Sequence, residues 1–440
     1  MNSAVAEPQD YSEAVKSRSL LRSLLVRGAS TVFLIQVVGT GATYLSNVGF
    51  ARWAGAVQYG VYAYAFGWSK LISAFCVLGF TTAVLKFVPE YVHQQSWTRL
   101  RGLLLHTQAI TFGAGVLCAA IVAGCAAHFA SREMVPALVA AAVTLPLLGV
   151  TTLQSQVLRG FQFVTAAYAP GAILRPILVS TMAFVAFRVT GNLSGKTILN
   201  VLSIAVCAEV LLQSMLLKNQ FPPHGPRGYE FDLRFWWGLA GPLLLITALQ
   251  LLYQTDVLLI GMLRGPYEAG LYNAAARTAT LPSFFLVAFN GISAPLISRL
   301  HVAGDREGLR TLVKTTAHGA FWPALAMAIG MAIFARPLML AFGHDFTASR
   351  PAFLILIVGQ LLTAMAGSAG FLLMLTGYQN QSVKIYAVAV VINLALNFAL
   401  IPMWGPVGAA IASVVTTAFW NIALVIIIKR RLNVLSLPLP

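Results

Sequence analysis

Long apolar runs alternate with short polar segments along almost the whole chain. Twelve runs can be drawn, each close to the roughly 20 residues that a helix needs to cross a bilayer. They lie near residues 28–50, 61–85, 103–124, 136–158, 168–188, 197–217, 236–262, 271–298, 315–335, 351–376, 384–402 and 407–428. The pattern predicts an all-α, polytopic membrane protein of about twelve transmembrane helices.

The composition supports a membrane protein over a soluble one. The chain has 440 residues, of which 58% are hydrophobic and 10% are charged, whereas a soluble domain carries about 25% charged residues. The formal net charge is +16, which could indicate a nucleic-acid partner. The basic residues lie in short loops between apolar runs, however, and this distribution is typical of membrane topology. We therefore expect no nucleic-acid partner.

The distribution of Lys and Arg also predicts the orientation. With the N-terminus inside, the cytoplasmic segments hold 19 of these residues and the outer segments hold 7. The positive-inside rule then places both termini in the cytoplasm. Residues 1–27 mix acidic and basic side chains without a clean apolar core, so we expect an amphipathic cytoplasmic segment rather than a cleaved signal peptide.

Two short motifs recur in the two halves of the chain. Gly55–Tyr62 (GAVQYGVY) matches Gly265–Tyr272 (GPYEAGLY) at a distance of 210 residues, and Leu158–Gln162 (LRGFQ) matches Leu375–Gln379 (LTGYQ) at 217. Since each half has an even number of helices, both enter from the same side, so the repeat is parallel. The chain is predicted to comprise an amphipathic segment at 1–27, a first six-helix lobe at 28–218, a cytoplasmic linker at 219–235, a second six-helix lobe at 236–428 and a cytoplasmic tail at 429–440.

Three cations fall within predicted spans: Lys70, Arg175 and Arg277. A cation at a helix centre costs roughly 2.5–3.5 kcal/mol on insertion scales, so such residues usually face a cavity or a partner. Lys70 and Arg277 lie on equivalent helices of the two halves, and two cations facing one cavity suit an anionic ligand such as a diphosphate. The alternative is that each snorkels to the interface or pairs with a carboxylate. For Arg175, which precedes Pro176, structural pairing stays open.

Only two acidic residues lie inside predicted spans, Glu209 and Asp256. Each is a candidate for binding a coupling ion, either a proton or sodium, and each could instead neutralise a neighbouring arginine. The histidines and cysteines show no metal-ligand spacing, so we expect no metal site and no other cofactor. The segment Gly191–Thr197 imitates a phosphate-binding loop but has three residues between its glycines where four are needed, so we expect no ATP binding.

Several segments resemble bacterial polysaccharide-biosynthesis flippases. They are GFARWAGAVQYGVY (Gly49–Tyr62), LRGFQ (Leu158–Gln162), TDVLLIG (Thr255–Gly261) and GPVGAA (Gly405–Ala410). The resemblance is to the Wzx-type members of the multidrug/oligosaccharidyl-lipid/polysaccharide exporter superfamily, over roughly residues 15–430. It implies a V-shaped, two-lobed fold around a central cationic cavity, to which Lys70 and Arg277 would contribute. Arg52, at the outer end of the first helix, and Arg175 are further candidates for binding the diphosphate or sugar.

The resemblance also implies a function. It is the translocation of undecaprenyl-diphosphate-linked oligosaccharide across the bacterial cytoplasmic (inner) membrane, for a surface polysaccharide such as O-antigen, lipopolysaccharide or exopolysaccharide. The implied partners are that lipid-linked substrate and membrane lipids, with a polysaccharide polymerase and a chain-length regulator as further candidates. Two alternatives are a drug exporter of the same superfamily and, with less support, a polysaccharide polymerase or ligase. The longest outer loop, about 15 residues around Arg336–Arg350, is short for an active site, so we expect no enzyme.

Overall fold

A computed structural model shows a protein made of helices alone across the residues that it describes, which are 8–221, 228–238, 240–241, 244, 255–302, 305–376 and 379–432. In this part of the chain, eight helices are long and apolar enough to cross a membrane. Two of them, within α1 and α16, bend at Gly55 and Gly405 and so comprise two limbs each. The protein is therefore a multi-pass membrane protein, while the number twelve and the side of the termini stay predictions.

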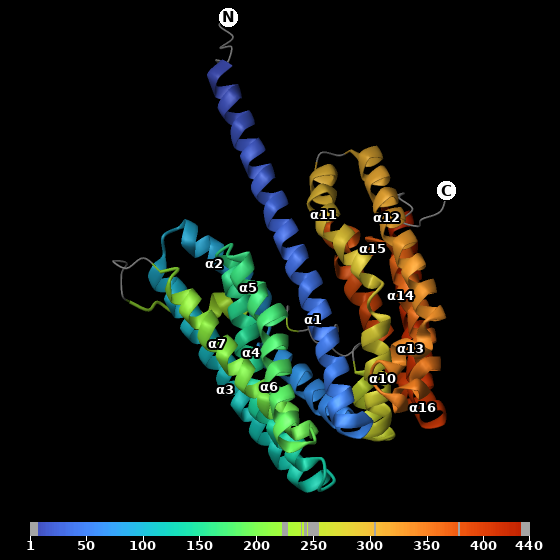
Figure 1. The fold of residues 1–440 in the computed structure, drawn as a ribbon. Helices are drawn as coiled ribbons and strands as arrows, with labels where there is room; N and C mark the ends of the chain where they lie inside the picture. Colours follow the sequence, from blue (N-terminus) through green and yellow to red (C-terminus); the bar gives the residue numbers. More distant parts are fainter. Residues whose placement is uncertain are drawn as a thin grey trace, which may run out of the picture.

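The helices form two lobes (Figure 1). The first contains α1 (Pro8–Cys76), α2 (Phe80–His93), α3 (Trp97–Phe129), α4 (Val135–Gly160), α5 (Val164–Ala169), the π-helix η1 (Pro170–Leu174), α6 (Arg175–Thr190) and α7 (Gly195–Lys218). The second contains α9 (Asp256–Leu263), α10 (Pro266–Ala279), α11 (Ser283–Val302), α12 (Arg306–Ile333), α13 (Ala335–Leu340), the 3-10 helix η2 (His344–Ser349), α14 (Arg350–Ala366), α15 (Ala369–Leu375) and α16 (Gln379–Leu432). The lobes meet at the end away from the termini and diverge toward the end that carries them.

Some sequence predictions fall wholly or partly outside the described residues. These are the side chains of the amphipathic segment, residues 222–227 of the linker, much of the predicted span 236–262, residues 377–378 of the LTGYQ motif, and residues 433–440 of the tail. One end of the linker region is described. Trp236, predicted to begin the second lobe, is fully buried in the first lobe, where its Nε1 donates to Tyr91 Oη at 2.9 Å. Residues around Trp236 thus pack on the first lobe in this structure.

The repeated motifs have matching backbone conformations. Gly55 has φ 74° and ψ 170°, and Gly265 has φ 91° and ψ 175°. A positive φ is the region that glycine adopts without steric cost, so each motif makes the same sharp bend before its second helix. The expected pseudo-symmetry of the lobes is therefore present in the backbone conformation as well as in the amino-acid sequence.

The two motifs also contact each other across the lobes. A Cβ at Gly60 would collide with the carbonyl oxygen of Pro266, and a Cβ at Gly270 would meet the carbonyl oxygen of Ala56 at 2.5 Å. Residues 60 and 270 are 210 apart, and so are residues 56 and 266. The contact of Gly60 with Pro266 is therefore repeated by the contact of Gly270 with Ala56. This reciprocity is what a two-fold axis between Gly60 and Gly270 requires. The absent side chains let the two helices approach at backbone distance.

A third matched pair extends the repeat to the last helix of each half. The backbone N–H of Gly195 donates to Gln58 Oε1 at 2.9 Å, and Gly405, 210 residues later, lies against Glu268, the equivalent of Gln58. Glu268 also pairs with Arg264 at 3.0 Å. The hydrogen bond and the charge of Glu268 raise the pKa of Arg264. Both halves therefore fix the start of their last helix against the same position of their second helix.

Aromatic contacts reinforce the meeting point of the lobes. Tyr44 packs edge-on against Phe342 with ring centroids 5.7 Å apart, and Tyr59 does so against Phe346 at 5.8 Å. Phe342 and Phe346, from the second lobe, are fully buried in a core otherwise formed mainly by the first lobe. Edge-to-face aromatic pairs add about 0.5–1.5 kcal/mol beyond their burial. This end of the protein is thus closed by packed side chains from both lobes.

Candidate functional site

A cavity of about 400 Å³ lies between the lobes. Its walls come from α1 on one side and from α9, α10, α14 and α16 on the other. Its polar and aromatic lining comprises Asn47, Tyr62, Phe66, Lys70, Asp256, Tyr272, Asn273, Thr280, Arg277, Gln360, Ser413 and Thr417. The size and the mixed lining are those of a small-molecule or headgroup site.

Lys70 and Arg277 face this cavity from opposite lobes. Lys70 lies about two helical turns beyond Tyr62 on the second limb of α1, and Arg277 lies one turn beyond Asn273 on α10. Both side chains are exposed within the structure. Among the described residues, neither forms an ion pair with a carboxylate. The pairing alternative thus finds no partner here, and two cations within one cavity can bind an anion jointly.

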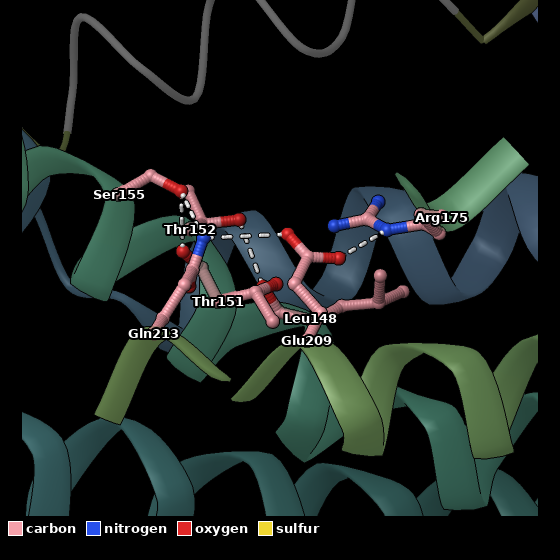
Figure 2. A network of polar contacts seen from close by, with 7 residues as sticks. All are labelled: Leu148, Thr151, Thr152, Ser155, Arg175, Glu209 and Gln213. Atoms are coloured by element: carbon pink, nitrogen blue, oxygen red, sulfur yellow. Dashed lines mark hydrogen bonds and ion pairs between the residues drawn. The ribbon is translucent and has the colours of Figure 1, made fainter. Parts of the chain in front are cut away.

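Arg175 and Glu209 form a pair within the first lobe. Arg175 Nε lies 2.6 Å from Glu209 Oε2 (Figure 2). Gln213 approaches the other carboxylate oxygen at 3.4 Å and donates to Ser155 Oγ at 3.0 Å. Glu209 is 1% exposed. The neutralising role that the sequence left open for both residues is therefore present in this structure, and neither residue lines the cavity.

Arg52 lies where the lobes meet, away from the cavity lining. Its Nε donates to the backbone carbonyl of Ala341 at 2.6 Å, and the side chain is exposed. The bond joins α1 to the segment after α13 in the second lobe. The structure thus separates the four predicted substrate-binding cations into two in the cavity, one in a buried pair and one in a contact between lobes.

Asp256 begins α9 and faces the same cavity as Lys70 and Arg277. It accepts hydrogen bonds from Tyr272 Oη at 2.8 Å, from Asn397 Nδ2 at 2.8 Å and from Ser413 Oγ. All three donors are neutral, so the described surroundings leave the negative charge of Asp256 uncompensated by an arginine or lysine salt bridge. A carboxylate of this kind, with amide and hydroxyl neighbours, can hold a proton or a hard cation.

The equivalent position in the first lobe has no charge. Ser46 lies 210 residues before Asp256, and Ser180 lies 217 residues before Asn397. These two serines are also in contact, since Ser180 Oγ donates to Ser46 Oγ at 2.6 Å. The same pair of helices thus meets through two hydroxyls in one lobe and through a carboxylate and an amide in the other.

A chain of hydrogen bonds crosses between the lobes beside the cavity. Asn273 Nδ2 in the second lobe donates to Tyr59 Oη at 2.8 Å, and Tyr59 Oη donates to Asn47 Oδ1 at 3.0 Å in the first lobe. All three side chains are buried. Asn47 and Asn273 also line the cavity. The sequence analysis does not predict a role for these three residues. Each is a polar side chain inside or beside an apolar run, and this is the feature that could have indicated them.

The described part of the chain contains no group of three His, Cys, Asp or Glu residues that could hold a metal ion. The four cysteines are free.

The fold is that of transporters of the MOP superfamily. The chain superposes on a multidrug resistance MATE family transporter in an inward-facing conformation with a TM-score of 0.73 and 13% identity, over 92% of this chain and 98% of that one. An outward-facing MATE conformation gives 0.66 over 92% and 95%. The lipid II flippase MurJ in an inward closed conformation gives 0.65 with 14% identity, over 92% and 87%.

The sequence gives the family. Residues 25–301 match the family described as "Polysaccharide biosynthesis protein", and the chain belongs to that family. In fold it is similar to a transporter of the MOP superfamily and to a lipid II flippase. The solved structures that share this fold are transport proteins.

Three relatives show the range of named functions. The "Probable low-salt glycan biosynthesis flippase Agl15" of Haloferax volcanii is 24% identical over 164 residues, which are 37% of this chain and 35% of that protein. The chain thus matches about a third of that relative's length. An "Uncharacterized membrane protein MJ1068" of Methanocaldococcus jannaschii is 21% identical over 88% and 81%. The "Probable multidrug resistance protein NorM" of Pseudomonas syringae pv. tomato is 28% identical over 44% of each chain.

Proposed function

We propose that this protein flips undecaprenyl-diphosphate-linked oligosaccharide across the bacterial cytoplasmic membrane for the assembly of a surface polysaccharide. One observation carries the proposal. Lys70 and Arg277 face one cavity from opposite lobes, and neither forms a salt bridge within the described residues. A diphosphate carries enough negative charge to pair with two such cations. The family, and the glycan flippase among the relatives, support the same substrate class.

In this proposal the lobes alternate between two arrangements. With the termini in the cytoplasm, the contact between Gly60 and Gly270 closes the outer side, and the cavity receives the headgroup from the inner leaflet. The greater similarity to the inward-facing MATE conformation is consistent with this state. The diphosphate binds Lys70 and Arg277, the prenyl tail stays in lipid, and rocking of the lobes then exposes the headgroup outside.

We infer that Asp256 is the coupling residue, with a proton or sodium as the ion. It faces the substrate cavity and has neutral donors around it, whereas Glu209 is already paired with Arg175. A cation at Asp256 and an anion at Arg277 would share one cavity, so occupancy of one site would alter the affinity of the other. Arg52 remains a candidate for contacting the glycan near the outer end.

The proposal is tested by replacing Arg277 with Ala. Surface polysaccharide is measured in a deletion strain complemented with wild type or variant at equal protein level. We expect a large loss of polysaccharide for Arg277→Ala, a smaller loss for Arg277→Lys, and normal output for Arg264→Ala, whose guanidinium is exposed and paired with Glu268. Full output from Arg277→Ala would remove the cation from the mechanism.

Drug export is a second candidate, because the fold is shared with MATE transporters and Asp256 places a carboxylate in the cavity. An organic cation would bind beside this carboxylate. Efflux of a cationic dye from cells that express the protein, measured with and without Asp256→Asn, separates the two functions. Dye efflux that depends on Asp256, together with unchanged polysaccharide in the deletion strain, would favour the exporter.

The cellular context would identify the substrate further. A polysaccharide polymerase and a chain-length regulator are the partners that we propose, because a flipped repeat unit must be polymerised outside. Co-purification of the tagged protein with these enzymes from its native membrane is the corresponding measurement.

A further inference from the structure

The Arg175–Glu209 pair lies close to the cavity without lining it. Pro176, the residue after Arg175, accepts a hydrogen bond from Ser46 Oγ at 3.3 Å through its carbonyl oxygen, and Asn47, the residue after Ser46, lines the cavity. The side chain of Arg175 is 23% exposed, whereas that of Glu209 is 2% exposed. The arginine is thus the more accessible member of the pair.

The guanidinium of Arg175 is only partly used. Its Nε donates to Glu209 Oε2 at 2.6 Å (Figure 2), and within the described residues its two terminal nitrogens have no other hydrogen-bond or ion-pair partner. A guanidinium has five N–H donors in a planar fork. Four of them are therefore available to a second anion.

Glu209, by contrast, is fixed from several sides. Gln213 approaches Oε1 at 3.4 Å, and a Cβ on Gly171 would lie 3.1 Å from the same oxygen. Gln213 is itself anchored to Ser155 of α4. Arg175 is the one charged side chain that contacts Glu209 in the described part of the chain. The carboxylate is thus held by several neighbours, whereas the terminal nitrogens of Arg175 have no second partner within the described residues.

The backbone before Arg175 has an unusual form. The π-helix η1 ends at Leu174, directly before the arginine, and single π-turns occur often at functional sites. Gly39 of α1 packs against this turn so closely that a Cβ would lie 2.7 Å from Ala172 Cβ. The first limb of α1 therefore touches the turn that positions Arg175, while the second limb of the same helix carries Lys70.

We propose that Glu209 holds Arg175 in reserve as a third cation for the diphosphate of the lipid-linked substrate. This inference rests on the proposed function. When the cavity is empty, Glu209 neutralises Arg175, because an unpaired buried charge is costly. When Lys70 and Arg277 hold a diphosphate, its oxygens compete for the terminal nitrogens of Arg175, a geometry in which arginine binds phosphate through two hydrogen bonds. After release, the arginine returns to Glu209.

The proposal predicts that substitutions of the two partners have opposite effects. The purified full-length protein in detergent is titrated calorimetrically with farnesyl diphosphate as the probe. Arg175→Gln should weaken binding about tenfold, because a hydrogen bond to a charged group is lost. Glu209→Gln should tighten binding about tenfold, because Arg175 no longer has a competing anion. The double variant should bind like Arg175→Gln alone.

Matched controls make each outcome decisive. Glu230→Gln removes the acid from the exposed Arg99–Glu230 pair and should leave binding unchanged. If Glu209→Gln weakens binding or leaves it unchanged, the pair is structural and the inference is wrong. If Arg175→Gln does not fold, Arg175→Lys replaces it and should weaken binding by a smaller factor, because the charge is kept without the fork.

One further variant separates this inference from the function on which it rests. Arg277→Gln is titrated under the same conditions. Wild-type affinity in that variant would overturn the proposed function itself. Weaker binding in Arg277→Gln, without tighter binding in Glu209→Gln, would overturn only the role of Glu209.

Discussion

Lys70 and Arg277 face the cavity as cations from opposite lobes, and Asp256 faces it as a carboxylate. Lys70 and Arg277 could be predicted because each interrupts an apolar run, and the structure places both at one cavity. The partners of the charges could not be predicted. Glu209 is 34 residues from Arg175, and Asn397 is 141 residues from Asp256. Such pairs depend on which helices pack together and on their rotation, which a single sequence does not give.

At the residue scale, Asp256→Asn tests the coupling proposal. The substitution removes the negative charge and keeps a side chain of the same shape. We expect transport that no longer responds to the proton or sodium gradient, with binding of farnesyl diphosphate retained. Transport is measured in proteoliposomes with an imposed gradient of each ion in turn. Ser46→Ala, at the neutral equivalent in the first lobe, is the control. Unaltered gradient dependence in Asp256→Asn would exclude this residue from coupling.

The hydrogen bond between Tyr59 and Asn273 gives a second prediction at this scale. Tyr59→Phe removes the hydroxyl that joins the lobes, which should cost about 1 kcal/mol of contact between them. Spin labels at the exposed positions Val57 and Leu340, one in each lobe, report their separation. We expect Tyr59→Phe to add a population at longer distance. Tyr62→Phe, on the same helix, removes a hydroxyl that makes no hydrogen bond between the lobes within the described part of the chain, and this variant should not add such a population.

At the scale of elements, the apolar runs predicted helices but not their continuity. Residues 51–60 were expected to form a loop between two spans, yet α1 runs from Pro8 to Cys76 with one break at Gly55. Gly405 interrupts α16 in the same manner. A polar segment can stay helical when a single glycine supplies the bend. The π-turn η1 was also not predictable, because it depends on how α1 and α7 pack around it.

The contact between Gly60 and Gly270 gives a prediction for these elements. Gly60→Ala places a methyl group against the carbonyl of Pro266 and should destabilise the closed contact by about 1–3 kcal/mol. Gly41→Ala on the same helix meets no atom within 4 Å and should stabilise the protein slightly, since alanine favours helix over glycine. Thermal unfolding in detergent compares the two. Equal melting temperatures for both variants would contradict the close packing described here.

At the scale of the whole molecule, the sequence repeat predicted two similar lobes, and the fold shows them. The sequence alone could not predict which ends of the two lobes are in contact. That information came from reciprocal contacts such as Gly60 with Pro266 and Gly270 with Ala56. The conformation of a transporter is a choice between states of similar energy, and one sequence encodes all of them.

Alternation of the lobes is tested with two pairs of spin labels. Gln95, between α2 and α3, and Glu307, in the first turn of α12, are exposed, and these helix ends lie on the side of the termini (Figure 1). Val57 and Leu340 report the opposite end. Addition of farnesyl diphosphate in liposomes should shorten the first distance and lengthen the second in part of the population. The pair Gln95 and Lys218, both within the first lobe, should not change. Changes of the same sign at both ends would exclude rocking.

The replacement of Asp256 and Asn397 by two serines in the first lobe sets a limit on the energy available for transport. In the proposed mechanism, in which Asp256 is the coupling residue, the one carboxylate couples a cycle to a single cation. Moving one charge through 100 mV yields about 2.3 kcal/mol, which corresponds to roughly a fiftyfold concentration ratio. The concentration gradient of the cation and the charge of the diphosphate add to this term, and movement of substrate beyond their sum must be driven by its consumption on the outer face. We expect the rate of such a flippase in cells to follow the demand of the enzymes that use its product.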